Sequence, residues 1–143
     1  QQTHIYALLK NVSTTNEVYR VAGAGHGCAV CYESEILCFV EDIGRHNATD
    51  TIAGQMWLTG IGGADKCLYS TGRLTSEIVI KAARMGIPVL LSRSGITNLG
   101  LELAKDLNIT LIARAKGRHF LVYHGHETLL YDAVAEDNKK RNK

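Results

Sequence analysis

The sequence has few of the features that mark chains other than globular domains. Its 143 residues include one proline (Pro88), one tryptophan and two phenylalanines, beside 14 glycines. No apolar run reaches the ~18 residues that a bilayer-spanning helix requires, and the first residues do not resemble a secretory leader. The formal net charge is only +2, so bulk electrostatics favours neither a nucleic-acid nor a membrane partner. We therefore expect one compact α/β domain with tight turns between strands and helices.

The four cysteines are Cys28, Cys31, Cys38 and Cys67, and without a leader they indicate free thiols in a reducing cytosol. Cys28 and Cys31 form a C-x-x-C pair, but the stretch around them is rich in strand formers, which sends the two side chains to opposite faces. Zinc needs four converging ligands, and the sequence has no second C-x-x-C pair. Buried thiols are favoured, with a zinc site completed by His26 or Cys38 and a reactive thiol as alternatives.

Hydrophobic periodicity predicts a three-layer α/β/α domain with a mixed sheet. Helices are expected at residues 3–12, around Ile52 and Met56, at 77–86 and at 99–108. Strands are expected at residues 28–33, 36–42, 66–70, 88–92, 110–115 and 120–124, and residues 17–23 are expected to be extended. Strands that are apolar throughout are buried on both faces, as a sheet between helical layers requires. The domain is assigned to residues 1–132 and a basic tail to residues 133–143.

Three successive strand-to-helix junctions each carry an arginine. These are Arg45 in "IGRHN", Arg73 in "TGRLTS" and Arg93 in "SRSGITN". In an open α/β sheet such junctions lie at the carboxyl ends of the strands, where ligands bind. Helix N-termini and glycines let an anion approach free N–H groups, and arginine offers a fork suited to phosphate oxygens. The pattern favours a polyanionic, nucleotide-like ligand.

Structural interpretations compete with this one. Asn47, Ser76 and Asn98 could be helix caps beside solvated arginines, and Glu77 with Lys81 has the spacing of a surface ion pair on a helix. A further basic segment lies between the last two strands. It is either a polar hairpin loop or, if it reaches the sheet edge that carries the three arginines, a source of more hydrogen-bond donors for the same ligand. It contains Arg114, Lys116, Arg118 and His119.

The segment "EDIGRH" also offers acids and a base. Glu41 and Asp42 are consecutive in a strand and point to opposite faces, so they do not form a convergent catalytic pair. We expect one of them to orient Arg45 or His46 instead.

Two blocks resemble the FdhD family of formate dehydrogenase accessory proteins. They are "EDIGRHNATD" at residues 41–50 and the block from Ser70 to Lys81, within a resemblance that extends over residues 23–123. The resemblance implies a cytidine-deaminase-like fold and a cytoplasmic sulfurtransferase. Such a protein takes persulfide sulfur from a cysteine desulfurase and passes it to the bis-molybdopterin guanine dinucleotide form of the molybdenum cofactor, for formate dehydrogenase. A homodimer is expected, with no nucleic-acid or membrane partner.

The resemblance also implies a set of cofactor-binding residues, at which guanine nucleotides could mimic the cofactor. The set is His26, Asp42, Gly44, Arg45, His46, Asn47, Asp50, Gly72, Arg73, Ser76, Glu77, Lys81, Ser92, Arg93, Arg114, Ala115, Lys116, Gly117, Arg118 and His119. In the family the sulfur-carrying cysteines lie in an upstream C-x-x-C loop, after which this chain is expected to begin. Cys28 and Cys31 instead fall on a small-residue segment of the family, so no catalytic residue and no resident metal is assigned here.

Two other functions are open at this stage. A zinc-dependent deaminase on a related fold would need an H-x-E…P-C-x-x-C arrangement, whereas Cys28 follows His26 and Gly27 where the glutamate would be. A non-catalytic scaffold could use the arginines to dock an acidic partner.

Overall fold

The computed structural model describes residues 1–15 and 21–133. Its helices are α1 (Gln2–Thr15), α3 (Arg45–Thr59), α4 (Ser76–Arg84) and α5 (Asn98–Asp106), followed by the short 3-10 helix η1 (His126–Thr128). Its strands are β1 (His26–Tyr32), β2 (Glu35–Asp42), β3 (Cys67–Ser70), β4 (Val89–Ser92), β5 (Thr110–Lys116) and β6 (His119–His124).

All six strands join one mixed sheet in the order β2-β1-β3-β4-β5-β6. Strands β3, β4 and β5 are parallel, because the helices α4 and α5 return the chain to the same end of the sheet between them. Strand β1 is antiparallel to both of its neighbours, and β6 is antiparallel to β5. The parallel centre and antiparallel flanks are the mixed sheet that the sequence predicts.

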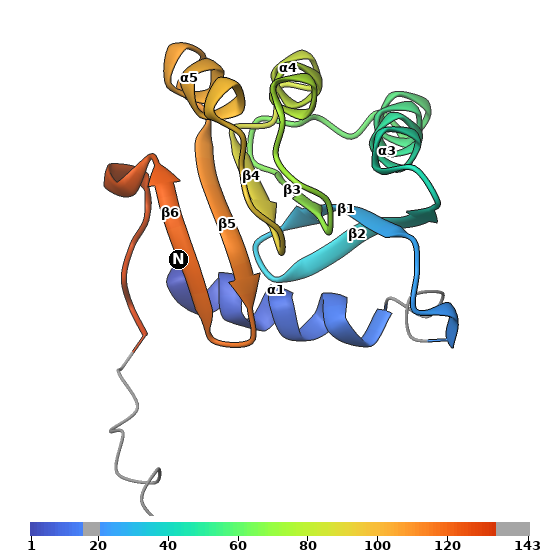
Figure 1. Cartoon of the computed structure of the whole chain (residues 1–143), viewed down its shortest axis with the longest axis horizontal. Coiled ribbons are helices and arrows are strands. Elements are labelled where there is room, and N and C mark those ends of the chain that lie inside the picture. Colours follow the sequence, from blue (N-terminus) through green and yellow to red (C-terminus); the bar gives the residue numbers. More distant parts are fainter. Residues whose placement is uncertain (16–20, 134–143) are drawn as a thin grey trace, which may run out of the picture.

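Helices cover both faces of the sheet (Figure 1). Helix α1 covers one face with Leu8, Leu9 and Val12, which pack against side chains such as Leu91 and Ile112. Helices α3, α4 and α5 cover the other face, where their apolar side chains meet a second set from the same strands. These include Ile52, Ile78, Ala104, Leu68, Leu90 and Leu111. Because neighbouring strand residues alternate between the two sets, the layers follow directly from the period-2 pattern of the strands.

The three-layer α/β/α prediction is therefore confirmed, and the predicted elements are found within a few residues of their expected bounds. The expected extended segment at 17–23 falls mainly on residues outside the described part, and Val21 and Ala22, which are described, are helical. Residues 134–143 of the predicted tail also lie outside the described part. Within residues 1–15 and 21–133, no helix is long and apolar enough to cross a membrane.

Candidate functional site

Sheet register brings all the predicted junctions to one end of the sheet. His26 pairs with Asp42, and Ser70, at the end of β3, pairs with Ser92, at the end of β4. Cys28 pairs with Ser70, which places the start of β1 beside the end of β3. Since β5 runs parallel to β4, the β5–β6 loop is at the same end. We name this end, with the loops that follow β2, β3, β4 and β5, the arginine end.

Serine hydroxyls brace the loops of the arginine end against one another. Ser92 Oγ donates to the Gly72 carbonyl oxygen at 2.6 Å and accepts from Ser94 N at 2.9 Å. Ser70 Oγ accepts from Gly72 N at 3.1 Å. Ser92 is fully buried, and its hydroxyl holds the loop after β3 and the loop after β4 together.

Gly72 and Arg45 pack together at the first of these loops. A Cβ atom added to Gly72 would lie 2.7 Å from Arg45 Cδ and 3.1 Å from Arg45 Cβ. Glycine is therefore required for the arginine to lie across the β3–α4 turn. The Nε atom of Arg45 is buried and has no hydrogen-bond partner among the described residues, which leaves it a donor for a bound group.

A pocket of about 270 Å³ lies beside these loops. Its lining residues are Gly25, His26, Thr71, Arg93 and Ser94. His26 Nδ1 lies 3.2 Å from Thr71 Oγ1, and the same oxygen accepts from Gly27 N at 3.0 Å. The pocket thus combines a guanidinium, an imidazole and hydroxyl groups, a donor-rich set suited to an anion.

The N-cap residues of the helices at this end differ from the cap residues considered from the sequence. The N-cap residues are Gly44, Thr75 and Thr97, so Asn47, Ser76 and Asn98 lie within their helices and do not cap them. Thr97 Oγ1 accepts from Gly100 N, whereas α3 and α4 have no side-chain cap. The first N–H groups of α3 and α4 are thus not occupied by a cap, and they carry the partial positive charge of a helix N-terminus.

Asp42 organises the approach to α3. Its Oδ1 accepts from Gly44 N at 2.8 Å and lies 3.4 Å from Asn47 Nδ2. These contacts fix the turn between β2 and α3. Asp42 therefore positions Gly44 and Asn47.

A polar network links α3 to α4. Lys81 Nζ lies 2.8 Å from Asp50 Oδ1 and 3.3 Å from Glu77 Oε1, which confirms the expected Glu77–Lys81 pair. His46 Nε2 lies 3.4 Å from Glu77 Oε2. Because these four side chains pair with one another, their first role is to fix the two helices relative to each other.

The β5–β6 loop reaches the arginine end. Arg114 N donates to the Ser94 carbonyl oxygen at 2.8 Å, and the Arg114 guanidinium lies beside Gly95. Arg114 has a φ of 50° where the β5–β6 register shifts. The guanidinium of Arg118 instead lies over the Tyr6 ring of α1, 5.1 Å from its centroid. The segment is both a hairpin loop and a part of the arginine end.

The C-x-x-C cysteines point to opposite faces, as predicted. Cys28 belongs to the core under α3–α5, and Cys31 belongs to the core under α1. Burial raises the pKa of Cys28 to about 12 and raises the pKa of Cys31 as well. Burial also raises the pKa of Cys67 to about 12. All three thiols are therefore protonated near neutral pH, where a sulfur nucleophile must be a thiolate.

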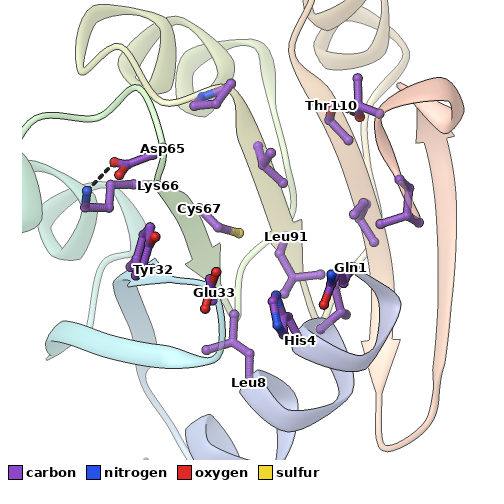
Figure 2. Close-up of a pocket in the computed structure, with 16 residues that line it drawn as sticks. Gln1, His4, Leu8, Tyr32, Glu33, Asp65, Lys66, Cys67, Leu91 and Thr110 are labelled. Atoms are coloured by element: carbon purple, nitrogen blue, oxygen red, sulfur yellow. Dashed lines mark hydrogen bonds and ion pairs between the residues drawn. The ribbon is translucent and has the colours of Figure 1, made fainter. Parts of the chain in front are cut away.

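A larger cavity of about 430 Å³ lies at the opposite end of the sheet. It lies between α1 and the first residues of β3, β4 and β5 (Figure 2), and its apolar lining includes Ile5, Leu8, Val89, Leu91 and Ile112. Polar residues such as His4, Glu33 and Lys66 also line it. Lys66 is ion-paired with Asp65 and lies over the Tyr32 ring. Within residues 1–15 and 21–133 no group of three or more metal-ligating side chains comes together.

Sequence reasoning missed two residues of the 270 Å³ pocket, namely Thr71 and Ser94. Ser94 is the sequence neighbour of the predicted residue Arg93, so widening the search by one position would have found it. No local signal marks Thr71, because its contact with His26 depends on the pairing of β1 with β3.

Solved structures define the class of fold. The chain superposes on a dCMP deaminase from the cyanophage S-TIM5 with a TM-score of 0.51 and 16% identity, over 70% of this chain and 91% of that one. At this identity the likeness concerns the fold alone, which is cytidine-deaminase-like as expected. A formate dehydrogenase accessory protein from Desulfotalea psychrophila superposes with a TM-score of 0.83 and 33% identity, over 90% of this chain and 56% of that one.

The family profile of FdhD/NarQ matches residues 1–130, and the chain therefore belongs to the FdhD/NarQ family. The sulfur carrier protein FdhD of Listeria monocytogenes is 37% identical over 87% of this chain and 48% of its own length. The sulfur carrier protein FdhD of Bacillus subtilis is 36% identical over 82% of this chain and 45% of its own. The chain thus spans about half the length of the curated relatives it matches.

Proposed function

We propose that this chain is the cofactor-binding part of a cytoplasmic, homodimeric sulfur carrier. The arginine end holds the bis-molybdopterin guanine dinucleotide cofactor as a substrate while persulfide sulfur from a cysteine desulfurase is passed to it. The sulfurated cofactor then goes to formate dehydrogenase. Family membership and the likeness to a formate dehydrogenase accessory protein support this proposal.

The observation that carries the proposal is the convergence of independent anion-binding groups. Arg45 begins α3, Arg93 follows β4 and Arg114 lies near the end of β5, and strand register brings these three elements to one end of the sheet. The N-termini of α3 and α4 begin at the same end. A ligand with several phosphate groups complements such an arrangement better than a single carboxylate does, since each arginine can bind a separate charge.

The residues present fit the dinucleotide part of that substrate. The buried Arg45 Nε has no partner among the described residues, and it lies where Gly72 lets the backbone come close. We assign phosphate binding to Arg45 and Arg93. We assign to Gly72 the close approach of the β3–α4 turn to the Arg45 side chain. The His46–Glu77–Lys81–Asp50 network holds α3 and α4 in place around them.

The direct test is a calorimetric titration of the full chain with GDP, which carries the guanine and two of the phosphates. We expect saturable binding that weakens as salt is added. Arg93→Gln should raise the Kd by at least tenfold, because a hydrogen bond from a charged donor to phosphate is worth about 1.5–3 kcal/mol.

Arg84 provides the matched control. It is exposed and ends α4 at the far end of that helix from the arginine end, so Arg84→Gln removes the same charge without touching the site. Its Kd should equal that of the unchanged chain within twofold. If GDP does not bind, or if both variants weaken it equally, the arginine end is not a nucleotide site and a scaffold for an acidic partner becomes the better proposal.

The sulfur step has a separate test. Loading a thiol with sulfur requires its thiolate to attack the desulfurase persulfide, whereby the sulfane sulfur moves and the desulfurase thiolate leaves. The raised pKa values of Cys28 and Cys67 suppress that attack. After incubation with a cysteine desulfurase and cysteine, intact-mass spectrometry should find no added sulfur on this chain. An added sulfur on any of its four cysteines would contradict the assignment of these thiols as structural.

A further inference from the structure

Thr71 connects β1 to the loop after β3 at the arginine end. It directly follows β3, and its N–H donates to the Gly27 carbonyl oxygen at 3.0 Å. Its hydroxyl oxygen accepts from Gly27 N at 3.0 Å and lies 3.2 Å from His26 Nδ1. One side chain therefore ties the first residues of β1 to the loop after β3, and both His26 and Thr71 line the 270 Å³ pocket.

Counting the donors and acceptors decides whether His26 Nδ1 accepts a hydrogen bond from the Thr71 hydroxyl or donates one to it. A hydroxyl has one donor and can accept from two partners, and a neutral imidazole has one donor and one acceptor nitrogen. The Gly27 N–H already occupies an acceptor position of Thr71 Oγ1. If Nδ1 also donated to that oxygen, the Thr71 hydroxyl hydrogen would have no acceptor among the described residues.

In the other arrangement every group that takes part in this contact is satisfied. The Thr71 O–H donates to His26 Nδ1, the Gly27 N–H donates to Thr71 Oγ1, and the imidazole proton is on Nε2. Half-burial of both side chains favours this arrangement, because it gives the Thr71 hydroxyl hydrogen an acceptor and leaves only the Nε2–H of His26 for a further partner.

From this accounting we propose that Thr71 is a positioning residue that fixes His26 as its Nε2–H tautomer, so that His26 presents a hydrogen-bond donor and not a base to whatever binds in the pocket. With Arg93 and Ser94 in the same lining, the pocket then offers donors to an anionic oxygen or sulfur atom of a bound group. The proposal rests on the proposed function for the identity of that group, but the tautomer itself does not depend on it.

The tautomer is measured without any ligand. Nitrogen chemical shifts of the full chain labelled with 15N in its imidazoles separate protonated from bare ring nitrogens, at a pH at which His26 is neutral. His26→Gln identifies the His26 signals among those of the six histidines. We expect a protonated Nε2 and a bare Nδ1 in the unchanged chain and in Thr71→Ser, and a mixture of both tautomers in Thr71→Val.

Two results would overturn the proposal. One is a protonated Nδ1 in the unchanged chain, and the other is an unaltered tautomer in Thr71→Val. A residue that merely held β1 against β3 would lower stability in Thr71→Val without changing the nitrogen shifts, so the spectra separate positioning from a structural role.

Binding of GDP gives the second readout. Thr71→Val should raise the Kd for GDP about tenfold, because the imidazole then offers a donor only part of the time and in more than one orientation. Thr71→Ser keeps the hydroxyl and should stay within twofold. If GDP does not bind at all while the Nε2–H tautomer is found, the proposed nucleotide function fails and the assignment of Thr71 stands. If GDP binds and Thr71→Val weakens it no more than Thr71→Ser, the positioning role is refuted.

Discussion

The two ends of the sheet form an instructive contrast. The opposite end holds the larger cavity, about 430 Å³, with apolar walls from α1 and three strands. The arginine end holds a pocket of about 270 Å³ with imidazole, guanidinium and hydroxyl groups. Volume alone would select the apolar cavity as the site. The chemistry selects the smaller pocket, because convergent polar groups on braced loops confer specificity and apolar walls do not.

The contrast follows from what each end of a parallel strand presents. At the arginine end the strands lead into helix N-termini, and the turns between them bring backbone N–H groups and small residues together. At the opposite end the strands begin after helix C-termini, and α1 crosses the sheet there with Leu8 in the cavity wall. Mutations at the two ends should therefore separate stability from binding.

Among the substitutions compared at neutral pH, Leu8→Ala should have the largest effect, and on stability alone. Leu8 is buried in the core under α1, so the change removes apolar contacts and enlarges a cavity, which costs about 3 kcal/mol. Urea unfolding measures the loss. Leu121, which is 40% exposed, is the control, and Leu121→Ala should cost less than about 1 kcal/mol. A loss of GDP affinity in folded Leu8→Ala would mean that the two ends are coupled.

Alkaline pH should lower stability by ionising thiols whose pKa is raised in the folded state, namely the buried Cys28 and the half-buried Cys67 at the opposite end. Burial raises the pKa of Cys28 from 9.0 to about 12, so the folded state keeps a proton that the unfolded chain releases above pH 9. Its stabilising contribution is complete below pH 9 and is lost as pH rises to about 12, by about 1.4 kcal/mol per pH unit.

Urea unfolding across that window tests the thiol assignment. In Cys28→Ala the unfolding free energy should decrease less steeply with pH, by up to the roughly 1.4 kcal/mol per pH unit that one thiol contributes. Cys67→Ala at the opposite end should change the slope in the same direction. If the slope in Cys28→Ala equals that of the unchanged chain, Cys28 ionises as readily in the folded protein as in the unfolded one, and its role as an inert core residue is wrong.

Gly72→Ala should affect binding and leave stability almost unchanged. Its new Cβ would displace the Arg45 side chain, which lies 2.7 Å away at Cδ, and we expect the Kd for GDP to rise about tenfold. Calorimetry measures this change. Gly54→Ala is the matched control, because a Cβ at Gly54 in α3 meets nothing within 4 Å. If both variants bind GDP with equal affinity, Arg45 is not a GDP-binding residue.

Val89→Ile should have the smallest effect and the opposite sign. Val89 lines the apolar cavity, and one added methylene group in that space should raise the unfolding free energy by about 0.8 kcal/mol. The thermal midpoint measures the gain, and the Kd for GDP should not change. A loss of stability would show that the cavity wall cannot accept added volume.

Periodicity and residue chemistry were enough to predict the elements, the three layers and the arginine junctions. Local pattern was not enough for the roles of polar side chains. Ser92 braces the Gly72 loop, and Asp42 holds Gly44, because the partners are fixed by loop geometry that no spacing rule encodes. The N-cap residues of α4 and α5 are Thr75 and Thr97, one residue before the candidates Ser76 and Asn98, since helix starts are uncertain by one or two residues.

The sequence by itself determined that Cys28 and Cys31 face different cores, because strand side chains alternate with a period of two. It also determined that each arginine follows a strand. Only the tertiary structure decided that the start of β1 lies beside the end of β3, which joins His26 to Thr71 across 45 positions of sequence. Strand order is set by how the helices pack on both faces, and that packing is a property of the whole chain.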